Sequence, residues 1–205
     1  MALPSQSDML SWIVILGDSE ILANTLKVVA LMADMLVKLY TLPPSGPLHA
    51  PLAAEHISIR RAAPQESPVL SAWVRRYFDE SWAVGCDVAL SQRPVTCFLA
   101  VLHEQRTAQP RDPYDLPAEY LLGFACYDVA SRGMFGATGV HPAYRQRGIG
   151  TALLVTTLHA MADEGYQYAI IGWAGSPEWY ARTVGAELIP DSEPGGFRGP
   201  LRGDL

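Results

Sequence analysis

The chain has 205 residues, of which 49% are hydrophobic and 18% are charged, so it carries enough apolar material for a core and is not a disordered segment. It has 15 Lys and Arg residues against 21 Asp and Glu residues, which gives a net charge of −6. This acidic balance argues against nucleic-acid binding, because phosphate neutralisation needs a basic surface.

The first fifty residues predict an appendage followed by a linker. Apolar residues recur at near-helical spacing over residues 21–33, which favours one or two helices, or a helix and a strand, within residues 8–40. Residues 42–51 contain four prolines and a glycine, a composition that is not expected to hold a helix or a central strand. We therefore expect an N-terminal appendage with a Pro-rich linker over residues 1–50.

The main domain is expected over residues 55–190, where strand-like and helix-like segments alternate. Strands are predicted at residues 57–61, 95–102, 120–129, 134–140, 168–173 and 187–190. Helices are predicted at residues 65–78, 81–90, 148–164 and 177–184. Residues 104–118 are expected to form an exposed loop and residues 191–205 a Gly- and Pro-rich tail. This order predicts an α/β fold in which helices flank a mixed central sheet on both faces.

Cysteine usage and the length of the apolar segments indicate the compartment. The three cysteines are widely spaced and form no CxxC pair, which disfavours a disulfide framework and a structural zinc. Cys97 and Cys126 lie in apolar runs and are expected to be buried. No two histidines share a metal-ligand spacing, so no metal is predicted. No segment approaches the roughly 20 apolar residues that span a bilayer, and the expected location is the cytoplasm, away from membranes.

One segment combines positive charge with glycines at a predicted helix start. Residues 129–162 contain no Asp or Glu although the chain is acidic, and Arg145 and Arg147 lie near their centre. Gly148 and Gly150 follow at the start of a helix, where unpaired amides and the helix dipole attract anions. The two glycines are also compatible with simple close packing of the helix on the sheet. The arginines and the absence of acids favour an anion site, of a kind that is neither a Walker A motif nor a Rossmann fingerprint.

This segment carries a family resemblance. Arg145-Gln-Arg-Gly-Ile-Gly150, preceded by Val140-His-Pro-Ala-Tyr144, resembles the acyl-CoA signature Arg/Gln-x-x-Gly-x-Gly/Ala of the GNAT superfamily, the Gcn5-related N-acetyltransferases. Trp179-Tyr180 followed by Val184-Gly-Ala186 resembles a later element of the same family. The resemblance covers roughly residues 57–190, is closest to a poorly characterised bacterial branch, and implies the GNAT fold with acetyl-CoA as co-substrate.

The resemblance also implies roles for matched positions. Backbone groups of Gly139 and Val140 would pair with the pantetheine arm, and Tyr180 would give a proton to the leaving thiolate. A simple core position on a short helix is the alternative for Tyr180. The remaining expected cofactor contacts are Arg145, Gln146, Arg147, Gly148, Ile149, Gly150, Thr151 and Ser176.

Three features depart from the family pattern or stay open. Trp173 stands where many members have an Asn, Ser176 replaces a small apolar residue, and the usual final hairpin looks reduced to a Gly-rich tail over residues 193–199. The aromatic residues of segment 73–82 are expected in the core, with a wall of the acceptor pocket as the alternative. The general base is open between direct loss of the proton to solvent and the side chains of Asp128, Glu80, Asp87 and His141.

The predicted activity is transfer of an acetyl group from acetyl-CoA to a primary amine, on a small molecule, by direct attack in a ternary complex. The first alternative is a non-catalytic module that binds acyl-CoA and reports it to a partner. The second is an interaction protein that assembles through residues 1–50, and a homodimer is one such assembly. A native start at Met35, with residues 1–34 as an upstream extension, also fits the sequence.

Overall fold

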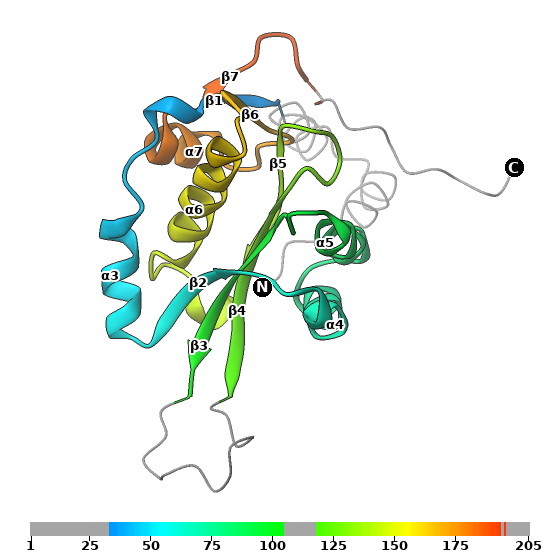
Figure 1. Cartoon of the computed structure of the whole chain (residues 1–205). Coiled ribbons are helices and arrows are strands. Elements are labelled where there is room, and N and C mark those ends of the chain that lie inside the picture. Colours follow the sequence, from blue (N-terminus) through cyan, green and yellow to red (C-terminus); the bar gives the residue numbers. More distant parts are fainter. Residues whose placement is uncertain (1–32, 105–117, 194, 196–205) are drawn as a thin grey trace, which may run out of the picture.

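The computed structural model describes residues 33–104, 118–193 and 195, and these form a seven-stranded sheet with helices on both faces (Figure 1). The strand order is β2-β3-β4-β5-β6-β1-β7, and the pair β5–β6 is parallel whereas the other pairs that are recorded are antiparallel. The predicted α/β class, a mixed sheet flanked by helices, is confirmed.

The bounds of the elements follow the sequence pattern closely in the middle of the chain. The strands are β1 (Met35–Lys38), β2 (Ile57–Arg61), β3 (Cys97–His103), β4 (Glu119–Tyr127), β5 (Met134–Val140), β6 (Tyr168–Ile171) and β7 (Glu187–Leu188). The helices are α3 (Gly46–Ala54), α4 (Ser67–Tyr77), α5 (Glu80–Ser91), α6 (Ile149–Asp163) and α7 (Pro177–Val184). Short 3-10 helices lie at η1 (Leu39–Thr41), η2 (Pro64–Glu66) and η3 (Pro142–Tyr144).

Two expectations about the N-terminal part were wrong. Residues 35–38 form β1, which lies inside the sheet between β6 and β7 rather than in an appendage. The expected Pro-rich linker contains the helix α3. Pro47 lies in its first turn, where a missing N–H costs nothing, and only Pro51 removes a hydrogen bond from the interior. Residues 1–32 and most of the loop expected over residues 104–118 lie outside the described part.

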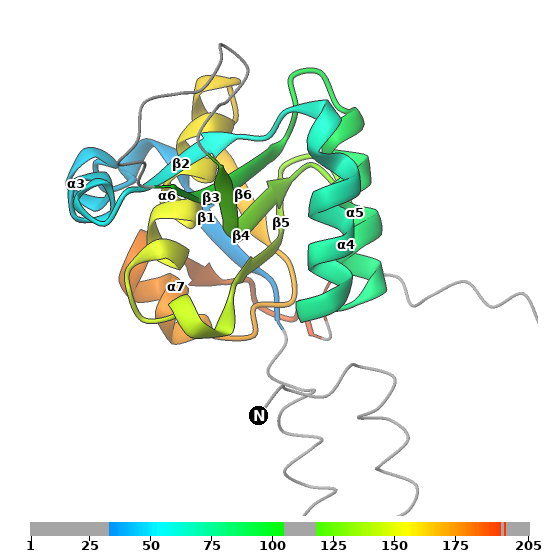
Figure 2. The same ribbon diagram turned by 90° about the horizontal axis from the view of Figure 1, so that it is seen from below.

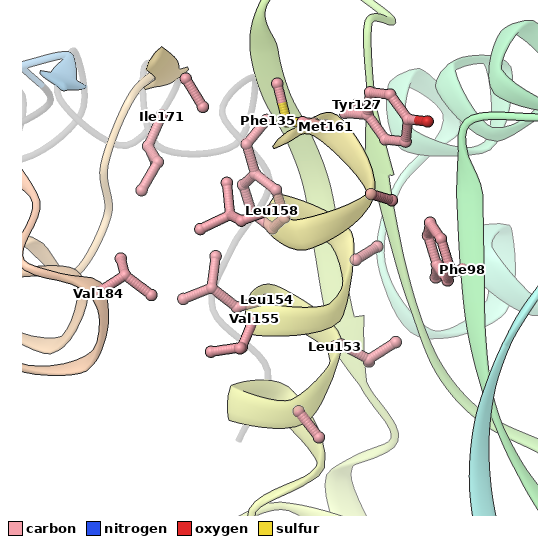
Figure 3. Close-up of a cluster of buried hydrophobic side chains, with 14 of the residues drawn as sticks. Phe98, Tyr127, Phe135, Leu153, Leu154, Val155, Leu158, Met161, Ile171 and Val184 are labelled. Carbon is pink, nitrogen blue, oxygen red and sulfur yellow. The ribbon is translucent and has the colours of Figure 1, made fainter. Parts of the chain in front are cut away.

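Two hydrophobic clusters fill the space between the helices and the two faces of the sheet. Helices α4 and α5 lie on one face and α3, α6 and α7 on the other (Figure 2). Helix α6 is the centre of the larger cluster, and its apolar side chains meet Phe135, Ile171 and Val184 (Figure 3). The smaller cluster lies under α4 and α5 and contains all three cysteines, each a buried free thiol, as expected for Cys97 and Cys126.

Within the described residues, no helix is long and apolar enough to cross a membrane. The same residues contain no group of three or more side chains of the metal-ligand type arranged to hold an ion.

Candidate active site

The sheet opens between its two parallel strands. The ladder between β5 and β6 contains the pairs Met134↔Ile170 and Phe135↔Ile171. Strand β6 ends at Ile171, whereas β5 continues to Val140. Along residues 136–140, no strand of the described chain pairs with the edge of β5 that faces away from β4. An extended ligand could hydrogen-bond to this edge as an added strand, and Gly139 and Val140 lie on it.

Gly139 has no room for a side chain on the face of the sheet that α4 and α5 cover. A Cβ atom there would lie 2.4 Å from the ring of Phe78, at the end of α4, and 3.0 Å from the ring of Phe124. Phe78 also stacks on Trp82 with ring centroids 5.3 Å apart. Phe78 therefore packs against the smaller hydrophobic cluster, in line with the core role expected for the aromatic segment. Its ring covers Gly139 of β5 on the face that carries α4 and α5.

The loop after β5 leads directly into α6. His141 follows the strand, and its Nδ1 accepts a hydrogen bond from the amide of Ala143 at 3.2 Å. Gln146 and Gly148 both have left-handed backbone conformations, with φ of 63° and 80°. Helix α6 begins at Ile149, so the amides of its first turn lack intrahelical acceptors and lie at the positive end of the helix dipole.

The two arginines of the loop have different contacts. Arg145 donates from Nε to the carbonyl oxygen of Val140 at 3.1 Å, which ties the loop to the end of β5. Arg147 lies over the ring of Tyr144, 5.2 Å from its centroid, and its Nη1 is 3.3 Å from a carboxylate oxygen of Glu55. The ion pair is half exposed on both sides and contributes little to stability. The positive charge of Arg147 therefore stays available to an anionic ligand at this surface.

Tyr180 lies on α7, the helix that follows β6 in the chain. Its ring packs against Trp179, with centroids 4.7 Å apart, and against the larger hydrophobic cluster. Burial raises the pKa of Tyr180 to about 12, because desolvation disfavours the phenolate. Ser176 stands at the N-terminal end of α7, where its carbonyl oxygen accepts from the amides of residues 179 and 180. Its side chain makes no capping hydrogen bond.

The carboxylate of Asp128, one of the candidates for the general base, is engaged in hydrogen bonds away from the open end of β5. It lies in the turn between β4 and β5, at the opposite end of β5 from Val140. One carboxylate oxygen accepts from the amide of Gly133 at 2.7 Å, and the other accepts from the hydroxyl of Tyr166 at 2.5 Å. These contacts hold the hairpin together and occupy the carboxylate, which argues against Asp128 as the general base.

The other candidate bases differ in their surroundings. Glu80 is exposed and forms an ion pair with Arg75 at 2.7 Å, whose hydrogen bond lowers the pKa of Glu80. Asp87 accepts hydrogen bonds from Ser67 and Ser71, which join α5 to α4. His141 is the candidate that adjoins the open end of β5.

A pocket of about 490 Å³ adjoins His141 on the α4 face. It is lined by Trp73, Tyr77, Leu102, Tyr120, Leu121, Leu122, His141 and Tyr144. Within the aromatic segment, Trp73, Phe78 and Trp82 pack against the smaller hydrophobic cluster and are partly buried. Trp73 also lines the pocket, together with Tyr77.

Asp34 is a residue of this site that the sequence pattern did not indicate. It immediately precedes β1, lies 7% exposed, and its Oδ1 accepts from the amide of Trp173 at 3.1 Å. The pattern of residues 35–38 suited a short strand, but nothing local to it indicated pairing with β6.

Solved structures with the same fold are known. One is the GCN5-related glucosamine N-acetyltransferase region of a fungal multi-domain GH3 β-N-acetylglucosaminidase, with a TM-score of 0.57 and 15% identity, covering 77% of this chain and 19% of that chain. Another is a GCN5-related N-acetyltransferase from Sphaerobacter thermophilus, with a TM-score of 0.53 and 20% identity, covering 77% of this chain and 48% of that chain. The chain thus spans less than half of either protein.

No curated protein matches the chain. The family model described as the acetyltransferase (GNAT) family matches residues 67–185, which is more than half of the chain and includes α4, the open strand β5, the arginine-glycine loop and α7. The chain therefore belongs to the GNAT acetyltransferase family.

Proposed function

We propose that the protein transfers the acetyl group of acetyl-CoA to a primary amine on a small molecule, by direct attack in a ternary complex. The observation that carries this proposal is the open edge of β5, which ends beside the N-terminus of α6. The edge offers backbone groups to an amide-containing arm, and the helix N-terminus offers amides to a pyrophosphate. Acetyl-CoA contains both groups in this order.

Residues of β5, of the loop before α6 and of the start of α7 contact different parts of acetyl-CoA in this proposal. Backbone groups of Gly139 and Val140 hold the pantetheine arm, and the amides of residues 146–151 hold the pyrophosphate. The guanidinium groups of Arg145 and Arg147 add positive charge. Ser176 lies at the far side of the opening, at the start of α7. Binding at these separate points brings the thioester and the amine together and lowers the entropic part of the barrier.

The transfer needs a proton donor for the leaving group. The amine nitrogen attacks the thioester carbon, the C–S bond of the tetrahedral intermediate breaks, and the amine gives up one proton. The hydroxyl of Tyr180 gives a proton to the thiolate and then regains one from solvent. Its pKa of about 12 keeps the phenol protonated at neutral pH, as this role requires. The proton of the amine leaves to solvent or to His141.

Two features support the finer parts of the proposal. The pocket beside His141 is lined by aromatic and leucine side chains next to the open end of β5, which supports binding of the acceptor there. The three cysteines are free thiols, which supports a reducing, cytoplasmic setting.

The first test is calorimetric titration of the protein with acetyl-CoA, followed by measurement of thiol release with a panel of primary amines. We expect binding with a Kd in the micromolar range and release of CoA with at least one amine. Arg147→Glu should weaken binding because it places a negative charge beside the pyrophosphate. Absence of binding by the folded wild-type protein would overturn the proposal.

Tyr180→Phe separates the enzyme from a non-catalytic sensor. We expect kcat to fall at least about tenfold, because the proton donor is lost. The Kd for acetyl-CoA should stay within about twofold, because the ring remains. In the wild-type protein, ionisation of Tyr180 should not reduce kcat below about pH 11, since its pKa is about 12. Unchanged turnover in the variant would exclude Tyr180 as the proton donor and favour another acid.

A further inference from the structure

Asp34 brings a buried carboxylate to the point where β6 ends. Because β1 runs antiparallel to β6, with Met35 opposite Ile171, the residue before β1 lies beside the residues that follow β6. Asp34 is 7% exposed, and its Oδ1 accepts from the amide of Trp173 at 3.1 Å. A residue from the start of the described chain thus fixes a turn near its other end.

The turn that Asp34 holds is strained. Trp173 has φ of 48°, in the left-handed region that side chains with a Cβ rarely adopt. Such a conformation persists only where the surroundings stabilise it. The amide of Trp173 points to the carboxylate of Asp34, and the next amide, that of Ala174, donates to the carbonyl oxygen of Ala33 at 3.2 Å. Two consecutive amides after β6 are therefore bound by the residues before β1.

Asp34 is itself held from a third segment. Its amide donates to the hydroxyl of Ser192 at 3.0 Å, and its carbonyl oxygen accepts from the amide of Ile189 at 2.9 Å. Gly195 also packs against this junction, since a Cβ atom there would lie 2.1 Å from the indole of Trp173. The position of the carboxylate is thus determined by the backbone on both sides of it.

The turn leads from the open end of β6 into α7. Residues 172–176 connect the last residue of β6 to the first residue of α7, which carries Tyr180. Gly172, the first of these residues, packs against β5, since a Cβ atom there would lie 2.3 Å from the terminal methyl group of Met134. The left-handed residue Trp173 therefore lies in the short turn through which the chain passes from β6 into α7.

We propose that Asp34 is a positioning residue of the acyl-CoA site: by binding the amide of Trp173 it fixes the turn that places α7 and Tyr180 opposite the open edge of β5. This inference rests on the proposed function for the identity of the ligand. A charged acceptor suits the role, because a hydrogen bond to a carboxylate is stronger than one to a neutral oxygen.

The test compares Asp34→Ala with Asp34→Asn, and uses Ser192→Ala as the matched variant at the same junction. In Asp34→Ala the amide of Trp173 loses its acceptor, and we expect the Kd for acetyl-CoA to rise about tenfold. In Asp34→Asn the amide oxygen still accepts, and the Kd should stay within about threefold of the wild-type value. Ser192→Ala removes a contact to the backbone of Asp34 but leaves the bond to Trp173, so it should lower Tm without changing the Kd.

A second measurement tests the hydrogen bond between Asp34 and the amide of Trp173 in the absence of acetyl-CoA. Hydrogen exchange of the Trp173 amide should be slow in the wild-type protein and in Asp34→Asn, and at least about tenfold faster in Asp34→Ala. A Trp173 amide that exchanges freely in the wild type overturns the proposal even if Asp34→Ala does not fold.

Two further outcomes would also overturn the proposal. One is a Kd in folded Asp34→Ala equal to that of the wild type, which would leave Asp34 a purely structural role. The other is an equal loss of affinity in Asp34→Asn and Asp34→Ala. If the wild-type protein does not bind acetyl-CoA at all, the proposed function fails, while the exchange rates still decide whether Asp34 fixes the turn.

Discussion

The two glycines of the loop before α6 have different reasons to be glycine. Gly148 has φ of 80°, so any side chain would strain the backbone although nothing lies within 4 Å of its added Cβ. Gly150 has an ordinary helical position, and an added Cβ would make a normal contact with Val140 at 3.7 Å. The conformation of the loop therefore depends on Gly148 and not on Gly150.

This difference predicts unequal effects of the same substitution. Gly148→Ala should cost about 1 kcal/mol of backbone strain and shift the first amides of α6. We expect the Kd for acetyl-CoA to rise about fivefold or more in this variant, and to change less than twofold in Gly150→Ala. Calorimetric titration of both variants measures this, and equal Kd values would show that the left-handed conformation is not needed for binding.

Local sequence was informative for residues whose task depends on their neighbours in the chain. The arginine-glycine loop was singled out by its charge and glycines, and Tyr180 by the family resemblance, and each lies within one continuous segment. Asp128 and Asp34 show the limit of this reasoning. The contacts of Asp128 to Tyr166, and of Asp34 to Trp173, connect segments far apart in the sequence, and no local pattern predicts them.

At the scale of single elements, one charged cluster joins three segments at the edge of the sheet. Arg60 on β2 binds Glu66 of η2 at 2.6 Å and Glu119 of β4 at 2.5 Å. Glu66 also accepts from the amide of Ala63 at 2.6 Å. The hydrogen bonds from Arg60 lower the pKa of Glu66 below its ordinary value of 4.5, although its partial burial acts in the opposite direction.

The shift predicts an acid-dependent loss of stability. Because the folded state has the lower pKa, the stabilisation is complete above about pH 4.5 and is lost as the pH falls through the folded pKa. Glu66→Gln should lower the free energy of unfolding by about 1 kcal/mol at pH 7. The difference from the wild type should shrink below pH 4.

Denaturant unfolding of the wild type and of Glu66→Gln, at pH 7 and again below pH 4, measures this effect. Glu80→Gln is the control, because the pair of Glu80 with Arg75 is fully exposed, and it should have a smaller effect. A difference between wild type and Glu66→Gln that does not depend on pH would contradict the expected role of the charge.

Element bounds were predicted best where a residue ends an element for a steric reason. Helix α7 matches its predicted range because Pro177 begins it and Gly185, with φ of 66°, ends it. Strand β6 ends two residues earlier than predicted. Its apolar pattern continues to Trp173, but Gly172 and the left-handed Trp173 turn the chain away.

At the scale of the whole molecule, the sheet depends on its N-terminal strand. Val37 is 0% exposed and Met35 is 2% exposed, and both belong to the larger hydrophobic cluster. The prolines after β1 suggested a boundary, but Pro47 lies in the first turn of α3 and Pro51 inside this helix. Composition alone does not distinguish a linker from a short helix with proline in its first turn.

The burial of Val37 predicts that β1 is needed for folding. Val37→Asp would place an unpaired carboxylate in the core and should lower the free energy of unfolding by at least about 3 kcal/mol. Lys38→Gln, one residue further along the strand, removes only the exposed ion pair with Glu187 and should have little effect. Urea unfolding of both variants measures this, and a small effect of Val37→Asp would mean that β1 is dispensable.

The place of β1 in the sheet has a consequence for the time course of synthesis. Asp34 and Ser192, which are hydrogen-bonded in the folded protein, are 158 residues apart in the chain. At the usual rate of translation, roughly 10 to 30 s separate the appearance of the two residues. For most of that interval, until β6 has been synthesised, β1 has neither of its partner strands, and the nascent chain carries an unpaired apolar segment that is open to chaperones or to other chains. The seven strands can therefore pair fully only after residue 188 has left the ribosome.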